Sequence, residues 1–167
     1  MSRLIPILIV VALAAAGWWW VHGSGPPPAE ATVSRVVDGD TVWVRAGARS
    51  LDVRLLGIDT PETVDPHRPV GCFGPEASAY TKHLLTGRRV RLVYDRQLHD
   101  TYGRWLAYIY LERPGRSDLF VNARLVSAGY ARTLSIPPNT AHATDLSALE
   151  REAALAAGCG RPAVEDR

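Results

Sequence analysis

The chain has 167 residues, 47% hydrophobic and 22% charged, a composition that excludes a disordered or low-complexity protein. Its formal net charge at pH 7 is only +2, which excludes the bulk basicity of proteins that coat nucleic acids. Binding of a polyanion would therefore depend on where individual arginines are placed. Without about 30 N-terminal residues, the remaining length suits one compact domain.

An uncharged, mostly apolar run from Leu4 to Val21 follows Arg3 near the N-terminus. This run is slightly long for a signal-peptide core and just long enough to span a bilayer of about 30 Å. Positive charge only at its start predicts that the N-terminus stays inside and the domain is exported. We therefore predict a transmembrane anchor or signal segment over residues 1–22, with an uncleaved anchor favoured, and a Pro/Gly-rich linker over 23–31.

The sequence contains two cysteines, Cys72 and Cys159. An even number of cysteines in an exported domain permits one disulfide, and two unpaired buried thiols are the alternative. Because we expect export, the disulfide is the favoured interpretation.

Five short runs rich in alternating or β-branched apolar residues predict strands. They cover residues 32–37, 41–44, 51–58, 89–94 and 105–111. The first two runs lie on either side of Asp38-Gly39, a pair typical of a turn between two strands.

Three segments predict helices, each ended by a glycine. The first opens at Gly74-Pro75-Glu76 and ends before Gly87, and the others cover residues 121–128 and 146–157. We predict an α+β, mainly β fold in which a five-stranded OB-type barrel is capped by three helices. This domain is expected over residues 32–160, with a flexible tail at 161–167.

Asp38-Gly39-Asp40-Thr41 is the first of three polar clusters. An isolated Asp-Gly is usually only a hairpin turn. A second acid at Asp40 is less expected, because aspartate is disfavoured where a strand begins.

The second cluster extends from Arg54 to Thr63. Arg54 interrupts an apolar strand, where a charge is costly unless it is paired or faces a site. Asp40 and Asp59 could together hold a calcium ion through oxygen ligands, and Glu62 could polarise a water beside it. A group of strand-end turn residues with a salt bridge to Arg54 is an equally good interpretation of this cluster alone.

The third cluster, Asp100 to Arg104, precedes the aromatic strand 105–110. An arginine after a glycine at a strand start is often only a solvated surface residue. However, two arginines, two metal-binding carboxylates and one further carboxylate are together the groups that phosphodiester hydrolysis requires.

These clusters resemble the motifs of the staphylococcal nuclease family, in the same order and at similar spacing. The resemblance covers roughly residues 32–145. The matching stretches are Val37–Val42, Arg54–Leu56, Asp59–Thr63, Gly74–Ala79, Tyr102–Arg104 and Leu106–Tyr110.

The resemblance implies an OB-fold barrel that binds one calcium ion and cleaves DNA and RNA endonucleolytically, leaving 3′-phosphate ends. It implies that the Asp40 and Asp59 side chains and the backbone carbonyl of Thr60 hold the ion. Glu62 is implied as the general base or water-orienting group.

The resemblance also implies that Arg54 and Arg104 clamp the phosphate and that Tyr102 contacts a nucleotide. Two departures from the family pattern bear on substrate binding. Thr101 replaces a phosphate-binding lysine, and residues 133–137 replace a stretch that supplies stacking tyrosines in the best-known member. We therefore expect weaker substrate affinity with the chemistry retained.

A calcium-dependent endonuclease acting on DNA and RNA is the leading hypothesis. The alternatives are a catalytically silent nucleic-acid-binding OB module and a membrane-tethered structural protein. The combination of Glu62, Arg54 and Arg104 argues against the binding module, because binding alone requires no base beside a metal. We expect a monomer outside the cytoplasm, anchored to the membrane or secreted after cleavage.

Overall fold

The computed structural model describes residues 26–61 and 74–157. The predicted membrane segment 1–22 and tail 161–167 lie outside these residues, as do Glu62, Cys72 and Cys159. Within the described ranges, no helix combines the length and apolar character needed to span a membrane.

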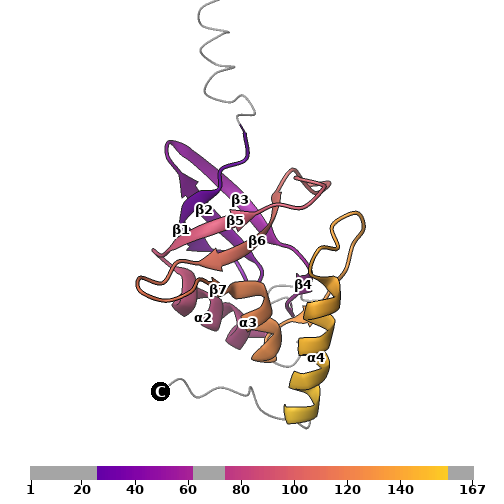
Figure 1. Cartoon of the computed structure of the whole chain (residues 1–167). Coiled ribbons are helices and arrows are strands. Elements are labelled where there is room, and N and C mark those ends of the chain that lie inside the picture. The colour runs from indigo at the N-terminus through magenta and orange to yellow at the C-terminus, as the bar shows by residue number, and fades with distance from the viewer. Residues whose placement is uncertain (1–25, 62–73, 158–167) are drawn as a thin grey trace, which may run out of the picture.

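Five strands form a closed barrel, drawn from indigo to salmon in Figure 1. Antiparallel pairing joins β1 to β2, β2 to β3, β1 to β5 and β5 to β6. Parallel pairing of β3 with β6 closes the cylinder. The bounds are Glu30–Val36 for β1, Thr41–Ala46 for β2, Arg49–Leu55 for β3, Arg89–Val93 for β5 and Trp105–Leu111 for β6. This arrangement confirms the predicted OB-type barrel.

The barrel interior is filled by the inward-facing residues of every strand, because side chains alternate between the two faces of a strand. Among the most buried are Val33, Val42, Val53, Val90 and Ile109, each with no solvent exposure. Side chains on the alternate positions of β3 therefore point outward, and these include the polar pair Asp52 and Arg54.

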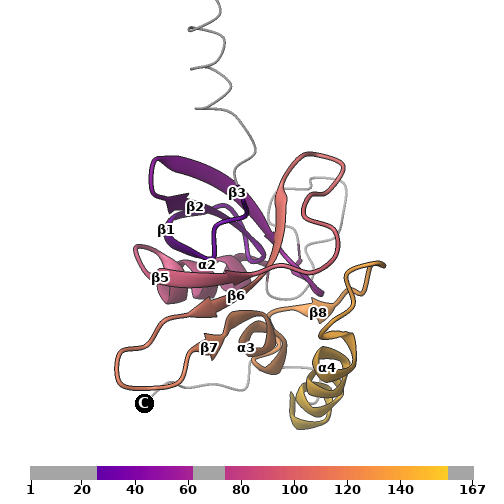
Figure 2. The same ribbon diagram turned by 45° about the horizontal axis from the view of Figure 1, so that its top comes forward.

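Three helices cover the barrel, as predicted: α2 (Gly74–Leu85), α3 (Val121–Ser127) and α4 (Ala143–Ala157). In Figure 1, α2 and α3 lie below the barrel and α4 lies beside its lower part, away from the end where the described chain begins; Figure 2 shows α3 and α4 below β5 and β6. Helix α4 begins three residues before the predicted start at residue 146. It packs against α3 and buries Leu146 completely.

The predicted strand 51–58 was wrong in extent, because the chain turns after Leu55. Gly57 has a φ of +77°, a conformation that L-residues with a side chain rarely adopt. A Cβ at Gly57 would also lie 2.7 Å from Cδ1 of Leu146. This turn starts a separate short strand, β4 (Ile58–Asp59), which pairs with β8 (Arg132–Thr133) rather than with the barrel.

The last residues of the predicted linker 23–31 belong to the barrel instead. Strand β1 begins at Glu30, and the Ala29 carbonyl accepts a hydrogen bond of 2.8 Å from the Leu92 amide. The Tyr94 hydroxyl donates to the Pro28 carbonyl at 2.9 Å. Burial raises the pKa of Tyr94 to about 12, so the hydroxyl remains a donor at neutral pH. A proline lacks an amide donor but keeps its carbonyl, which allows this segment to bind a strand edge.

Asn122 at the start of α3 connects the barrel to the chain after β3. It is completely buried, accepts a hydrogen bond from the Ile109 amide at 3.0 Å and donates to the Leu56 carbonyl at 2.7 Å. The side chain thereby fixes the strand that carries Arg54 relative to β6. A short antiparallel strand on the outer edge of β6, β7 (Leu119–Phe120), leads directly into the helix.

Replacing Asn122 with Ala should lower the free energy of unfolding by about 2–4 kcal/mol, because two buried backbone groups lose their partners. Urea denaturation followed by tryptophan fluorescence measures this change. Ser127→Ala, at the other end of α3, is the control and should change stability by less than about 0.5 kcal/mol. An equally small effect for Asn122→Ala would show that the bonds do not stabilise the fold.

Candidate active site

The turn between β1 and β2 places Asp40 at the start of β2. The Asp38 carboxylate accepts a hydrogen bond of 3.1 Å from the Asp40 amide, and the Val37 amide donates to the Thr41 carbonyl at 2.9 Å. A Cβ at Gly39 would lie 2.7 Å from the side chain of Thr60. Only glycine at this position lets the segment after β4 approach the turn so closely.

The Asp40 carboxylate is almost completely buried, with 1% of the residue exposed. One oxygen accepts hydrogen bonds from the amide and the hydroxyl of Thr60, at 2.7 and 3.0 Å. The other accepts from the Thr41 hydroxyl at 3.2 Å and is paired with Nη1 of Arg54. A carboxylate at this depth is stable only when it is paired and hydrogen-bonded, and here both conditions are met.

Arg54 joins the two carboxylates that the sequence predicted as metal ligands. Its Nη1 pairs with Asp40, and its Nη2 lies 2.8 Å from Oδ1 of Asp59 and 3.4 Å from the Ile58 carbonyl. The Asp59 side chain is 58% exposed, whereas that of Arg54 is 19% exposed. Both carboxylates therefore contact the two terminal nitrogens of one guanidinium.

This donor set fits a hard divalent cation such as calcium. Asp40 and Asp59 supply carboxylate oxygens that already converge on one positive group, and the chain between them offers the Thr60 carbonyl. Among residues 26–61 and 74–157, no three histidines, cysteines, aspartates or glutamates gather as a metal site. The predicted third carboxylate, Glu62, lies outside these ranges.

The second predicted arginine, Arg104, is the last residue of the connection between β5 and β6, directly before Trp105. Asp100 holds its Nε at 2.6 Å and accepts further hydrogen bonds of 2.9 Å from the amides of Tyr102 and Arg104. Burial on its own would raise the pKa of Asp100. The bonds from Arg104 and Tyr102 outweigh burial and lower the pKa below its usual value.

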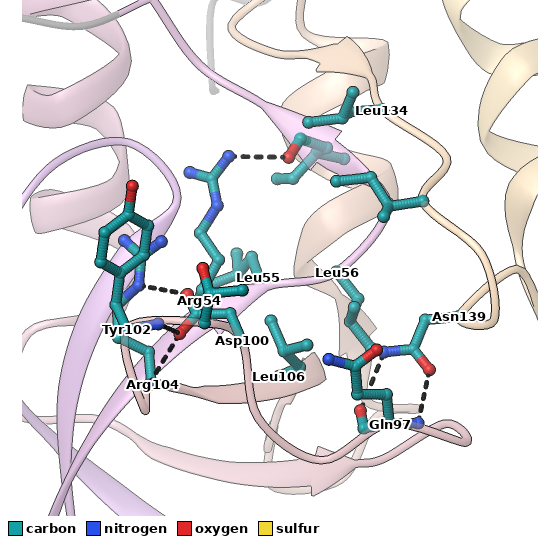
Figure 3. Close-up of a pocket in the computed structure, with 14 residues that line it drawn as sticks. Arg54, Leu55, Leu56, Gln97, Asp100, Tyr102, Arg104, Leu106, Leu134 and Asn139 are labelled. Atoms are coloured by element: carbon teal, nitrogen blue, oxygen red, sulfur yellow. Dashed lines mark hydrogen bonds and ion pairs between the residues drawn. The ribbon is translucent and has the colours of Figure 1, made fainter.

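One pocket of about 320 Å³ is lined by residues of the second and third clusters, including Arg54 and Arg104. Arg54, Tyr102 and Arg104 lie on one side of it, and Leu134 comes from the chain after β8, as Figure 3 shows. The Tyr102 ring is 84% exposed and lies 5.4 Å from the Arg104 guanidinium carbon. Two arginines far apart in the sequence therefore face a shared space.

Several residues of this pocket were not singled out for a role from the sequence. For Asp100 the sequence holds a local signal. Asp100 stands four residues before Arg104, with Gly103 between them, and a turn at the glycine places the carboxylate to bind the arginine. The others had none: Leu134 and Ile136 follow β8, and Gln97 and Asn139 meet through two hydrogen bonds of 2.8 Å. Only the folded chain places them beside the arginines.

Asp52 lies on the outer face of β3, two residues from Arg54. One of its carboxylate oxygens is buried and has no hydrogen-bond partner in the described part of the chain. Burial raises its pKa, and Asp100 and Asp38 add to this effect, while Arg104 and Arg35 oppose it. The ionised form of Asp52 is therefore less stable in the folded protein than in the unfolded chain.

Asp52→Asn should raise the melting temperature at pH 7 by about 2 °C, because the neutral amide avoids this cost. As the pH falls through the raised pKa, Asp52 takes up a proton and the advantage shrinks. The advantage should vanish below the unfolded-state value near 3.8. Thermal melts at pH 7 and pH 3.5 test this, with Asp118→Asn as a control that lacks the stabilising effect. An equal gain in melting temperature at both pH values would contradict the conclusion that ionised Asp52 destabilises the fold.

Comparison with known proteins agrees with this geometry. The family model described as staphylococcal nuclease homologue matches residues 52–157. The thermonuclease of Staphylococcus intermedius is 40% identical over 141 residues, covering 80% of this chain and 81% of its own. The thermonuclease of Staphylococcus hyicus is 41% identical over 121 residues, covering 72% and 69%.

A more distant relative, the endonuclease YncB of Bacillus subtilis (strain 168), is 36% identical over 124 residues, covering 73% of this chain and 56% of its own. Residues 52–157, which the family model matches, contain β6, all three helices and most of β3. They therefore include both arginines and the pocket. The chain belongs to the staphylococcal nuclease family, which confirms the predicted enzyme class, a hydrolase of the nuclease type.

Proposed function

We propose that this protein is a calcium-dependent endonuclease that hydrolyses phosphodiester bonds of DNA and RNA. The observation that carries the proposal is the convergence of Arg54 and Arg104 on one pocket, beside the carboxylates of Asp40 and Asp59. Relatives at about 40% identity are named thermonucleases, which supports the same chemistry.

The two arginines would act on the phosphate in different ways. Arg104 uses only Nε in its bond to Asp100, so both Nη groups are available for a bidentate bond to phosphate oxygens. Arg54 uses both Nη groups in its bonds to Asp40 and Asp59. A phosphate must therefore compete with these carboxylates for Arg54. A calcium ion held by Asp40, Asp59 and the Thr60 carbonyl would supply positive charge that stabilises the negative charge developing on the phosphate.

Hydrolysis also requires a group that orients the water and accepts its proton. Glu62, the next carboxylate along the chain after Asp59, is our candidate. In-line attack opposite the 5′-oxygen would leave the phosphate on the 3′ end of the product. Removal of that phosphate by a phosphatase, followed by polymerase extension, identifies the end group.

Glu62→Gln should lower the turnover number on plasmid DNA and on RNA by about 10²–10⁴-fold, because the amide cannot accept the proton. Digestion by residues 26–167 is measured with calcium and with a chelator. Glu76→Gln, in the exposed first turn of α2, is the matched control and should retain full activity. Calcium-dependent digestion that persists in Glu62→Gln would exclude Glu62 as the base. Absence of digestion by a cooperatively folded wild type would favour a silent binding module.

Substrate affinity is expected to be modest, because the pocket offers aliphatic Leu134 and Ile136 where stacking aromatics would bind a base. Leu134→Tyr should tighten binding of a short single-stranded oligonucleotide roughly fivefold, the equivalent of about 1 kcal/mol of stacking. Fluorescence anisotropy in the presence of chelator measures binding without cleavage. Leu155→Tyr, on exposed α4 outside the pocket, controls for a general effect of an added ring. Equal gains in affinity for Leu134→Tyr and Leu155→Tyr would contradict the proposal that the pocket binds the nucleic acid bases.

We also propose that the domain is a monomer outside the cytoplasm, attached through residues 1–22, with Cys72 and Cys159 bonded to each other. These residues lie outside the described ranges, so the proposal rests on the sequence alone. A thiol assay on unreduced, denatured protein from the exported fraction should find no free thiol, and two free thiols would exclude the disulfide. Release of the protein from membranes by alkaline wash would exclude the anchor.

A further inference from the structure

The five residues from Asp100 to Arg104 form a tight turn built around one carboxylate. The Asp100 amide donates to the Arg104 carbonyl at 3.0 Å, and the Gly103 amide donates to the Asp100 carbonyl at 3.1 Å. Gly103 has a φ of +81°, which the turn requires and a side chain would disfavour. Pairing of His99 with Trp105 closes the base of this small hairpin.

The two oxygens of Asp100 have separate partners. Oδ1 accepts the amides of Tyr102 and Arg104, each at 2.9 Å, and so holds the backbone of the turn. Oδ2 accepts only Nε of Arg104, at 2.6 Å, and so holds the side chain. Figure 3 shows these bonds meeting at Asp100 beside the pocket.

This arrangement determines which nitrogens of Arg104 can reach a ligand. With Nε bound to Asp100, the two Nη groups make no hydrogen bond or ion pair among the described residues and form the end of the guanidinium that can bind a phosphate. The Arg104 side chain is 30% exposed and that of Asp100 is 17% exposed. Asp100 is thus the more sheltered member of the pair, and a phosphate would meet Arg104.

We propose that Asp100 is a positioning residue for phosphodiester hydrolysis, fixing Arg104 so that its two Nη groups face the reacting phosphate. The inference rests on the proposed nuclease function. Asp100 itself carries negative charge and opposes the approach of a polyanion. Its contribution is therefore orientation, which affects turnover, rather than attraction of the substrate, which affects affinity.

Asp100→Asn tests the roles of the two oxygens separately. The amide oxygen can still accept hydrogen bonds from the backbone amides, whereas the amide nitrogen cannot accept one from Nε of Arg104. The turnover number should fall about 10- to 100-fold, as expected for loss of orientation. KM should not rise, because a negative charge near the substrate is removed. Asp118→Asn is the matched control, since Asp118 binds Arg91 through Nε and Nη2 at 3.2 Å away from the pocket, and it should leave both constants unchanged.

A double-mutant cycle shows whether Asp100 acts through Arg104. In an Arg104→Gln background, Asp100→Asn should change the turnover number by less than twofold. Independent effects that multiply would overturn the proposal, as would wild-type turnover in Asp100→Asn alone. If Asp100→Asn fails to fold, Gly103→Ala tests the same turn, because its Cβ would meet open space and only the backbone is strained.

A readout independent of cleavage distinguishes failure of this inference from failure of the proposed function. In ¹⁵N-resolved NMR spectra at neutral pH, Nε–H of Arg104 should exchange slowly with water in the wild type and rapidly in Asp100→Asn. Rapid exchange in the wild type would overturn the positioning role even if the protein cleaves DNA. Slow exchange in a wild-type protein that cleaves no nucleic acid would support the fixed position of Arg104 but contradict the proposed nuclease function.

Discussion

The buried carboxylate of Asp40 is the interaction on which the rest of the site depends. Four donor groups contact this carboxylate, and they belong to Thr41 of β2, Arg54 of β3 and Thr60 after β4. One charged group therefore holds three parts of the chain together. A carboxylate with 1% of its residue exposed would be strongly destabilising without them. The same need to satisfy Asp40 explains Gly39 and the hydroxyl of Thr60. The hydroxyl donates to the carboxylate, and nothing larger than glycine at position 39 leaves room for the segment with Thr60 to reach Asp40.

The two arginines of the pocket are held by opposite means. Arg54 is engaged through its terminal nitrogens by the two carboxylates suited to a metal, whereas Arg104 is engaged through Nε and keeps its terminal nitrogens available. A ligand that neutralises Asp40 and Asp59 would therefore also change the partners of Arg54. Among the described residues, the carboxylate that binds Arg104 is Asp100, on the same turn. The site thus combines one arginine paired with two candidate metal ligands and one held by an aspartate of its own turn.

The pocket depends on contacts outside the barrel as much as on the barrel itself. The turn at Gly57 sends the chain from β3 to pair with β8, and α4 packs against this turn through Leu146. The segment after β8 is then held against the β5–β6 connection by Asn139 and Gln97. These contacts place Leu134 opposite the arginines, so part of the pocket lining is supplied by the segment after β8.

The sequence by itself determined the elements whose signals are local. Period-two apolar patterns identified the barrel strands and glycines marked the helix ends. Asp40 stood out as an acid entering a strand and Arg54 as a charge inside an apolar strand, whereas Asp59 and Arg104 stood out because they complete the groups that phosphodiester hydrolysis requires. The tertiary structure alone decided what depends on contacts between distant segments. Two-residue strands have no periodicity to detect, and the break of β3 at Gly57 is fixed by contact with Leu146, so neither could be found from local pattern. Likewise, Arg54 and Arg104 face one pocket only because β3 pairs with β6, since no local rule relates residues fifty positions apart.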